Sequence, residues 1–197
     1  MRKLLFAIAI AAAATLPTVA SAGTVKPYNH SGYWTNYAGI ADDGGYVCGM
    51  TAYSPTDTTR QVHVKYIPKD KVLLVQLFKN SWRIPDGTDV AIDLGFDKDL
   101  WASLDAAKGY TAQNAKLGGF VEFPIRPDSV SDFLGLFGEA DEMWVRFPNG
   151  NETPWITKMV GSRDAAKSLT ACMAAAPQAT QPFGKAPASQ RGNGVSL

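Results

Sequence analysis

Charged residues and histidines are scarce in this chain of 197 residues. Charged residues make up 19%, there are two histidines, and the formal net charge is +1. A surface that tracks nucleic-acid phosphates needs an excess of positive charge, so this balance argues against a nucleic-acid partner. Two histidines cannot supply a three-histidine metal site. Hydrophobic residues, at 46%, suit a packed globular core.

Long apolar runs are missing after the first 22 residues. The chain opens with Met1-Arg2-Lys3, continues with an apolar run over 4–14, and reaches the small residues Ala20-Ser21-Ala22. This order is typical of a secretory signal peptide, which we predict at 1–22. No later stretch approaches the ~18 apolar residues of a transmembrane helix. We expect a periplasmic or secreted protein without a membrane span, and an uncleaved N-terminal anchor is the alternative.

Only two cysteines are present, Cys48 and Cys172. They form no C-x-x-C redox motif and no zinc framework. Because exported proteins meet an oxidising environment, we predict a structural disulfide between them. The alternative, a catalytic thiol, would need His30 or His63 as its base.

Catalytic motifs are also missing. The sequence has no G-x-S-x-G elbow, no phosphate loop, no H-E-x-x-H helix and no G-x-G-x-x-G turn. The aspartates of 93–99 lack the spacing of a helix-loop-helix calcium site and are interpreted as a solvated turn. Glu122, Asp141 and Glu142 are interpreted as surface charges rather than as an acid–base pair. We therefore predict no catalytic residues, no metal and no cofactor.

Strand patterns dominate the rest of the chain. Alternating or apolar runs predict strands at 33–40, 46–53, 60–66, 72–78, 89–93, 119–123, 143–147 and 155–159. The almost continuous apolar run over 72–78 indicates the centre of a sheet. His63 alternates with Val62 and Val64, so we expect it to face solvent. Residues 95–116 are expected to form a short strand or loop, and Pro124 is expected to end the strand before it.

Two helices are predicted late in the chain. One begins at Val130 behind the capping pair Asp128-Ser129, and the other begins at Ser162. The predicted fold class is α+β, a mainly antiparallel β-sheet or small sandwich with two short helices in the C-terminal half. Residues 23–32 are predicted to be a flexible leader, 33–176 a single β-rich globular domain, and 177–197 a disordered tail poor in core residues.

Aromatic residues, at 11%, are the best source of a binding surface. Trp82, Trp34 and Tyr53 are the candidates for ligand binding, and Trp82 is the strongest because it follows a strand end and precedes a turn. The alternative is that most aromatic rings fill the core.

Two stretches carry a family resemblance. The segment 82–93 (WRIPDGTDVAID) and the segment 156–169 (ITKMVGSRDAAKSL) resemble the invasion-associated locus B family of exported bacterial proteins. In that family a strand runs through a Pro-x-Gly turn into a second strand, and the chain later closes with a strand, a glycine and an alanine-rich helix. The resemblance implies a periplasmic or cell-surface β-rich domain linked to the envelope or to host-cell interaction, with no catalytic residues to transfer.

Three functional hypotheses follow. The first is a non-catalytic envelope protein that binds a macromolecular or small ligand, such as an envelope protein or a glycan. The second is a periplasmic inhibitor or immunity-type protein. The third, which the missing motifs disfavour, is an enzyme acting on cell-wall or exported substrates.

Overall fold

The chain folds around one antiparallel β-sheet. The structure, a computed structural model, describes residues 23–41, 44–54, 57–112 and 115–179, so the predicted signal peptide (1–22) and the tail from 180 onward lie outside the described residues. Its strands are β1 (Lys26–Ser31), β2 (Trp34–Ile40), β3 (Tyr46–Tyr53), β4 (Arg60–Ile67), β5 (Val72–Lys79), β6 (Thr88–Phe96), β7 (Asp99–Thr111), β8 (Gly119–Ile125), β9 (Glu142–Arg146) and β10 (Trp155–Lys158). The helices are α1 (Val130–Glu139) and α2 (Ser162–Ala179), with short 3₁₀ turns at Ala115–Leu117 and Pro127–Ser129. The predicted α+β class is confirmed.

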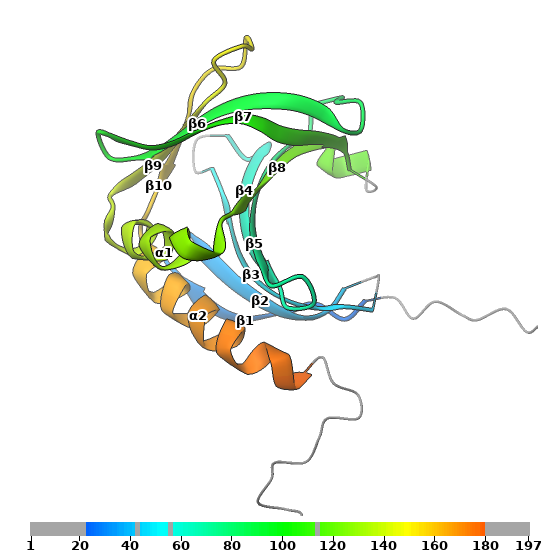
Figure 1. Cartoon of the computed structure of the whole chain (residues 1–197), viewed down its shortest axis with the longest axis vertical. Coiled ribbons are helices and arrows are strands. Elements are labelled where there is room, and N and C mark those ends of the chain that lie inside the picture. The colour runs from blue at the N-terminus through cyan, green and yellow to red at the C-terminus, as the bar shows by residue number, and fades with distance from the viewer. Residues whose placement is uncertain (1–22, 42–43, 55–56, 113–114, 180–197) are drawn as a thin grey trace, which may run out of the picture.

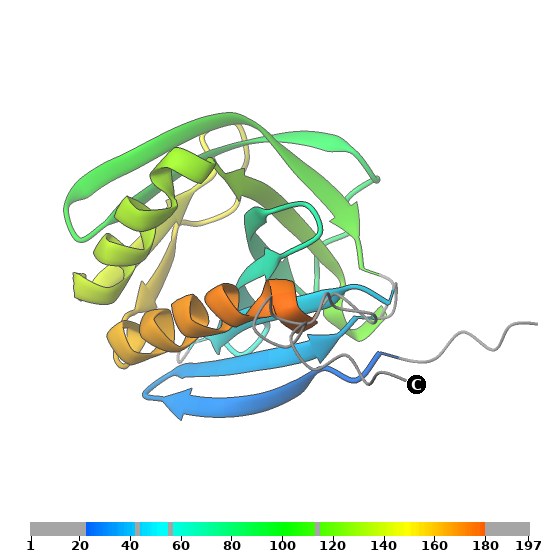
Figure 2. The same ribbon diagram turned by 60° about the horizontal axis from the view of Figure 1, so that its bottom comes forward.

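The strand order is β1-β2-β3-β4-β5-β8-β7-β6-β9-β10. The sheet curls into an open, barrel-like shape, and α1 and α2 lie on its open side (Figures 1 and 2). The apolar strand β5 is fifth of ten, at the centre, as its composition predicts. Its partner β8 continues through Pro124, which pairs with Leu74, so the expectation that Pro124 ends the strand was wrong.

The core fills the concave side of the sheet. Phe133 and Phe137 of α1 are completely buried, and Phe137 packs edge-to-face on Trp34 with ring centroids 4.6 Å apart. Helix α2 packs on β1, β2 and β3. There the buried Asn36 side chain donates a 2.9 Å hydrogen bond to the Ala165 carbonyl. The predicted helix starts hold, but Ser129 makes no side-chain capping bond, so packing rather than a cap fixes α1.

Residues 23–32, predicted as a flexible leader, contain the edge strand β1. Its polar, proline-containing sequence suits an edge strand, where a missing N–H can face away from the ladder. The register with β2 shifts between Pro27 and Asn29. Tyr28 then donates a 3.0 Å hydrogen bond to the Ser168 carbonyl of α2. Helix α2 also runs through Ala179, past the predicted tail start at 177.

Residues 95–116, expected to form a short strand or loop, contain the whole of β7, the longest strand of the described residues. β7 covers 13 residues and pairs with β6 through two register shifts. Such irregularities mask the period of two that marks a strand. In the turn between these strands, Asp97 Oδ1 accepts backbone N–H bonds of 2.9 Å from Asp141 and 3.0 Å from Glu142. That carboxylate therefore fixes the start of β9.

A disulfide joins the sheet to α2. The Cα atoms of Cys48 on β3 and Cys172 on α2 are 6.0 Å apart, and the residues are separated by 124 positions. This Cα distance lies inside the range of about 4.4–6.8 Å that native disulfides occupy. Cys48 is completely buried, whereas Cys172 is half-buried.

Reduction of this disulfide should lower the free energy of unfolding. The chain-entropy model gives about 4–5 kcal/mol for a loop this long. Urea unfolding of the protein isolated without reductant should show a lower midpoint after addition of dithiothreitol, and the Cys48→Ala/Cys172→Ala variant should match the reduced protein. Two free thiols by mass spectrometry, or equal midpoints with and without reductant, would contradict the bond.

Candidate functional site

One carboxylate collects hydrogen bonds from four side chains. Glu152 lies in the connection between β9 and β10, and its two oxygens accept bonds of 2.9 Å from Arg60 and Lys79. The indole N–H groups of Trp82 and Trp155 donate bonds of 3.1 Å to the same carboxylate. We call these four donors, Arg60, Lys79, Trp82 and Trp155, the carboxylate cradle. They come from β4, β5, the β5–β6 connection and β10.

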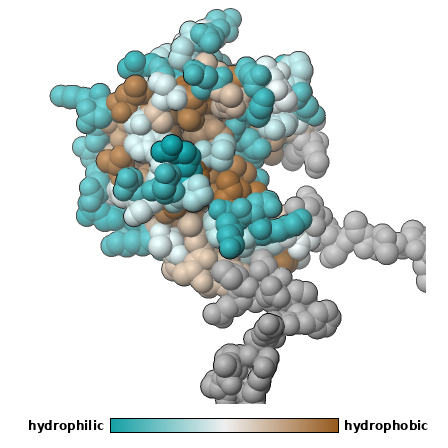
Figure 3. All heavy atoms as spheres, viewed as in Figure 1, coloured by the Kyte–Doolittle hydropathy of each residue, from teal (hydrophilic) through white to brown (hydrophobic). Residues whose placement is uncertain are grey.

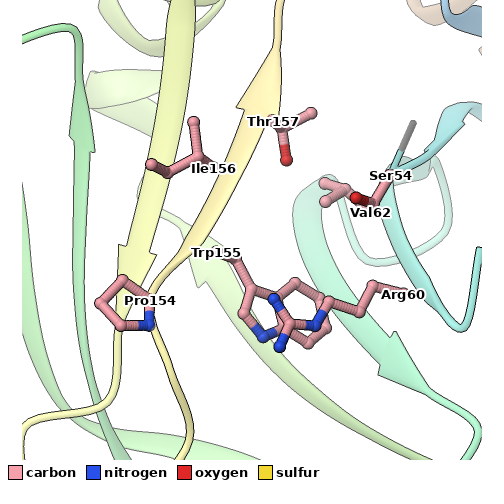
Figure 4. A pocket seen from close by; sticks show the side chains of 7 residues that line it. All are labelled: Ser54, Arg60, Val62, Pro154, Trp155, Ile156 and Thr157. Atoms are coloured by element: carbon pink, nitrogen blue, oxygen red, sulfur yellow. The ribbon is translucent and has the colours of Figure 1, made fainter. Parts of the chain in front are cut away.

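The aromatic rings of the cradle stack on one another. The centroids of Trp82 and Trp155 are 5.2 Å apart with an interplanar angle of 25°. Phe147 meets the Trp82 ring edge-on at 5.6 Å. The guanidinium of Arg60 lies over the Trp155 ring, 5.2 Å from its centroid (Figure 4). The Trp155 ring therefore makes two favourable electrostatic contacts. Its face attracts the Arg60 cation, and its N–H donates to the Glu152 carboxylate.

The Glu152 carboxylate is held in its charged form. Partial burial raises its pKa, but hydrogen bonds from Lys79, Trp155 and Trp82 and the charge of Lys79 lower the pKa by more. The net shift is downward. The side chain is 15% exposed and that of Lys79 is 19% exposed, so the pair is shielded from solvent more than an ordinary surface ion pair.

A cavity of about 470 Å³ lies beside the cradle, on the side of Trp82. Its apolar wall comes from β6, β8, Phe147 and the chain around Trp82, and its polar groups come from Asp89, Asp105 and the turn 149–151. The lining residues are Trp82, Ile84, Asp89, Val90, Ala91, Asp105, Val121, Phe147, Asn149, Gly150, Asn151 and Glu152. A volume in the range of about 300–1,000 Å³ suits a small ligand.

A smaller cavity of about 210 Å³ lies on the other side of the cradle. Arg60 and Val62 on β4 and Trp155 and Thr157 on β10 line it, and the Arg60 side chain reaches the Trp155 ring there (Figure 4). The stacked pair Trp82 and Trp155 thus stands between the two cavities, with one ring lining each.

The three aromatic residues that the sequence analysis selected for ligand binding do not form one site. Trp82 lines the larger cavity. Trp34 is completely buried against Phe137, which corrects the expectation that it could contact a ligand. It faces inward because β2 turns that side toward α1. Tyr53 is 55% exposed at the end of β3 and lines neither cavity, although the next residue, Ser54, lines the smaller one.

Sequence reasoning missed Glu152 and Phe147 as site residues. Glu152 is a single acid in a turn-rich connection and belongs to no catalytic or metal-binding motif. The only local signal was the Asn149-Gly150 turn, which predicts a hairpin but not where its side chains reach. The acids considered in the sequence lie elsewhere: Glu122 accepts a 2.7 Å bond from Gln76, and Glu142 pairs with Lys158.

The chain has one distant structural similarity and no sequence match to a family model or a curated protein. No family model matches the chain, and no curated protein matches it. Among solved structures, invasion associated protein B from Bartonella henselae is similar, with 17% sequence identity and a TM-score of 0.47. The similarity covers 74% of this chain and 97% of that chain. Membership of the invasion-associated locus B family stays a prediction.

A row of rings crosses the outer face of the sheet. His63 lies between Tyr37 and Phe78, at centroid distances of 6.2 and 4.9 Å, and the row continues through Phe120 to Tyr110. His63 is therefore half-buried, not solvent-facing as predicted. Desolvation, with a smaller effect from the charge of Lys65, lowers its pKa to about 4. Phe120 stacks on Phe78 and Tyr110, and His63 meets its two neighbours at tilted angles, so the row stabilises neighbouring strands.

The free energy of unfolding should therefore decrease as the pH is lowered from 6.5 to 4. In this window the unfolded chain binds a proton at His63 that the folded chain does not, because the folded pKa is about 4 and the ordinary value is 6.5. The nearby ionisable groups are Lys65 on the same strand, Tyr37 on β2, and Glu122, which bonds the adjacent Gln76.

Urea unfolding should show a loss of about 1–2 kcal/mol from pH 7 to pH 5 that the His63→Phe variant lacks. His63→Phe keeps a ring in the row but cannot take up a proton. The variant His30→Gln, at an exposed histidine, should keep the full loss. An unchanged pH dependence in His63→Phe would show that His63 is not the group responsible.

Proposed function

We propose that this chain is an exported binding protein whose cavity beside Trp82 holds a small ligand. The single observation that carries the proposal is the cavity itself, about 470 Å³, with an indole and a phenyl ring on its wall and amide and carboxylate groups on its rim. An apolar wall with a few polar groups at the mouth of a curled sheet is a common arrangement for small-molecule sites.

The lining points to a ligand with an apolar body and hydrogen-bond donors. Trp82, Ile84 and Val90 offer a wall for an aromatic or sugar ring. Asp89 and Asp105 accept hydrogen bonds from hydroxyl or amino groups, and Asp89 already pairs with Lys108 at the rim. An aryl glycoside has both features.

Export is part of this proposal. It is supported by the N-terminal sequence 1–22 and by the Cys48–Cys172 disulfide, which persists in an oxidising compartment. In the described part of the chain, neither helix has the length and apolar character needed to cross a bilayer. A role in the envelope or in host-cell interaction is also part of the proposal. The support for it is the resemblance of segments 82–93 and 156–169 to the invasion-associated locus B family.

Phenyl β-glucoside is a suitable probe. Its titration into ¹⁵N-labelled protein should shift the backbone amides of 149–152 and the Trp82 indole N–H in a saturable way. Ala91→Phe, which places a ring in the cavity and leaves every cradle residue unchanged, should weaken binding at least tenfold.

Trp144→Phe is the matched control, because Trp144 does not line the cavity. The guanidinium carbon of Arg146 lies 4.4 Å from the centroid of the Trp144 ring. It should bind like the parent protein. Shifts spread evenly over the surface, or equal affinity for Ala91→Phe and the parent, would overturn the proposed site.

A further inference from the structure

The carboxylate cradle has the features of a binding site whose occupant belongs to the same chain. Two cations and two indole N–H groups converge on one small anion, and every one of these bonds is 2.9 or 3.1 Å long. Such charge-assisted, multiple contacts are what proteins use to recognise carboxylates. A single glutamate at an ordinary structural ion pair needs only one partner, as Glu142 has in Lys158.

The donors and the acceptor belong to different parts of the fold. Arg60 and Lys79 stand on the central strands β4 and β5, and both are held there by ladder pairing with each other. Glu152 stands on the connection 148–154, whose ends are the buried residues Phe147 and Trp155. The neighbouring residues 148–151 are exposed, so the body of the sheet carries the cradle and an exposed connection supplies the anion.

Glu152 also lines the larger cavity. Any molecule in that cavity lies beside the cradle, with the Glu152 side chain at the boundary. Replacement of one carboxylate by another leaves all four donors paired, so the exchange avoids the cost of an unpaired buried donor. The released Glu152 side chain would enter solvent, where a carboxylate is well hydrated.

We propose that the cradle is a carboxylate-binding site, and that Glu152 is a tethered competitor which an incoming ligand carboxylate displaces. A tethered group acts at a high effective concentration, so the parent protein should bind a simple carboxylate weakly. A ligand that also has an apolar group should bind better, because that group can enter the adjacent cavity; this second part rests on the proposed function.

Acetate tests the cradle alone. In the Glu152→Ala variant, titration with sodium acetate at constant ionic strength, maintained with sodium chloride, should shift the indole N–H signals of Trp82 and Trp155. The apparent affinity should be at least tenfold higher than in the parent protein. Acetate should also raise the melting temperature of the variant above its value in chloride.

Two variants make the result specific. Lys79→Met added to Glu152→Ala should abolish the acetate effect, because Lys79 contacts both carboxylate oxygens. Glu142→Ala, which removes a carboxylate from an exposed pair, should show no acetate-dependent stabilisation. If Glu152→Ala does not fold in chloride, its refolding yield with acetate replaces the melting temperature as the readout.

Equal effects of acetate and chloride on Glu152→Ala, in signals or in refolding yield, would overturn the proposed carboxylate site. The second part is tested with N-acetyl-leucine against acetate, with N-acetyl-leucinamide as the ligand without a carboxylate. Tighter binding of N-acetyl-leucine than of either compound supports occupation of both cradle and cavity. Equal affinity for N-acetyl-leucine and acetate overturns the link to the cavity while the acetate result still decides the cradle.

Discussion

The Glu152 carboxylate is the contact on which closure of the curled sheet depends. Strands β4 and β5 are fourth and fifth in the strand order and β10 is the last, and Glu152, which precedes β10, joins this end strand to the centre of the sheet through Arg60 and Lys79. The two stacked tryptophans are oriented by the same carboxylate, since their N–H groups both point to it. Removal of this one side chain would leave two cations and two indoles without their common acceptor, which is costly in a shielded position.

A second contact closes the opposite end of β10. The Tyr33 N–H donates a 3.0 Å hydrogen bond to the Val160 carbonyl, which brings the β1–β2 turn against the β10–α2 turn. Gly32 and Gly161, with φ of 57° and 85°, make this approach feasible, because a Cβ on either would collide with the backbone of the other turn. The curled sheet is thus closed by specific contacts at both ends of one short strand.

Apolar side chains that remain at the surface form separate patches between hydrophilic ones on the face shown in Figure 3.

Local patterns were enough to predict most strands and both helix starts, because alternation and the helical period are properties of neighbouring residues. Val62 and Val64 mark one face of β4, and the apolar run of β5 marks the sheet centre. The sequence patterns did not predict β1, whose edge-strand composition reads as a loop, or β7, whose register shifts break the alternation. The site was largely unpredictable, since Glu152 meets Arg60 and Lys79 only through the curl of the sheet. Trp82 was found because a strand end beside a turn is a local signal, whereas the burial of Trp34 depends on which face α1 covers.

The pKa of Glu152 is the measurement that tests the role of this carboxylate most directly. In protein labelled with ¹³C at glutamate side chains, the Glu152 carboxyl shift can be followed as the pH is lowered. We expect a titration midpoint below the ordinary value of 4.5, because hydrogen bonds from Lys79, Trp155 and Trp82 and the charge of Lys79 lower the pKa by more than burial raises it. We also expect the Trp82 and Trp155 indole N–H signals to move with the same midpoint. A Glu152 midpoint at or above 4.5, or indole signals that do not respond, would contradict the central role of this carboxylate.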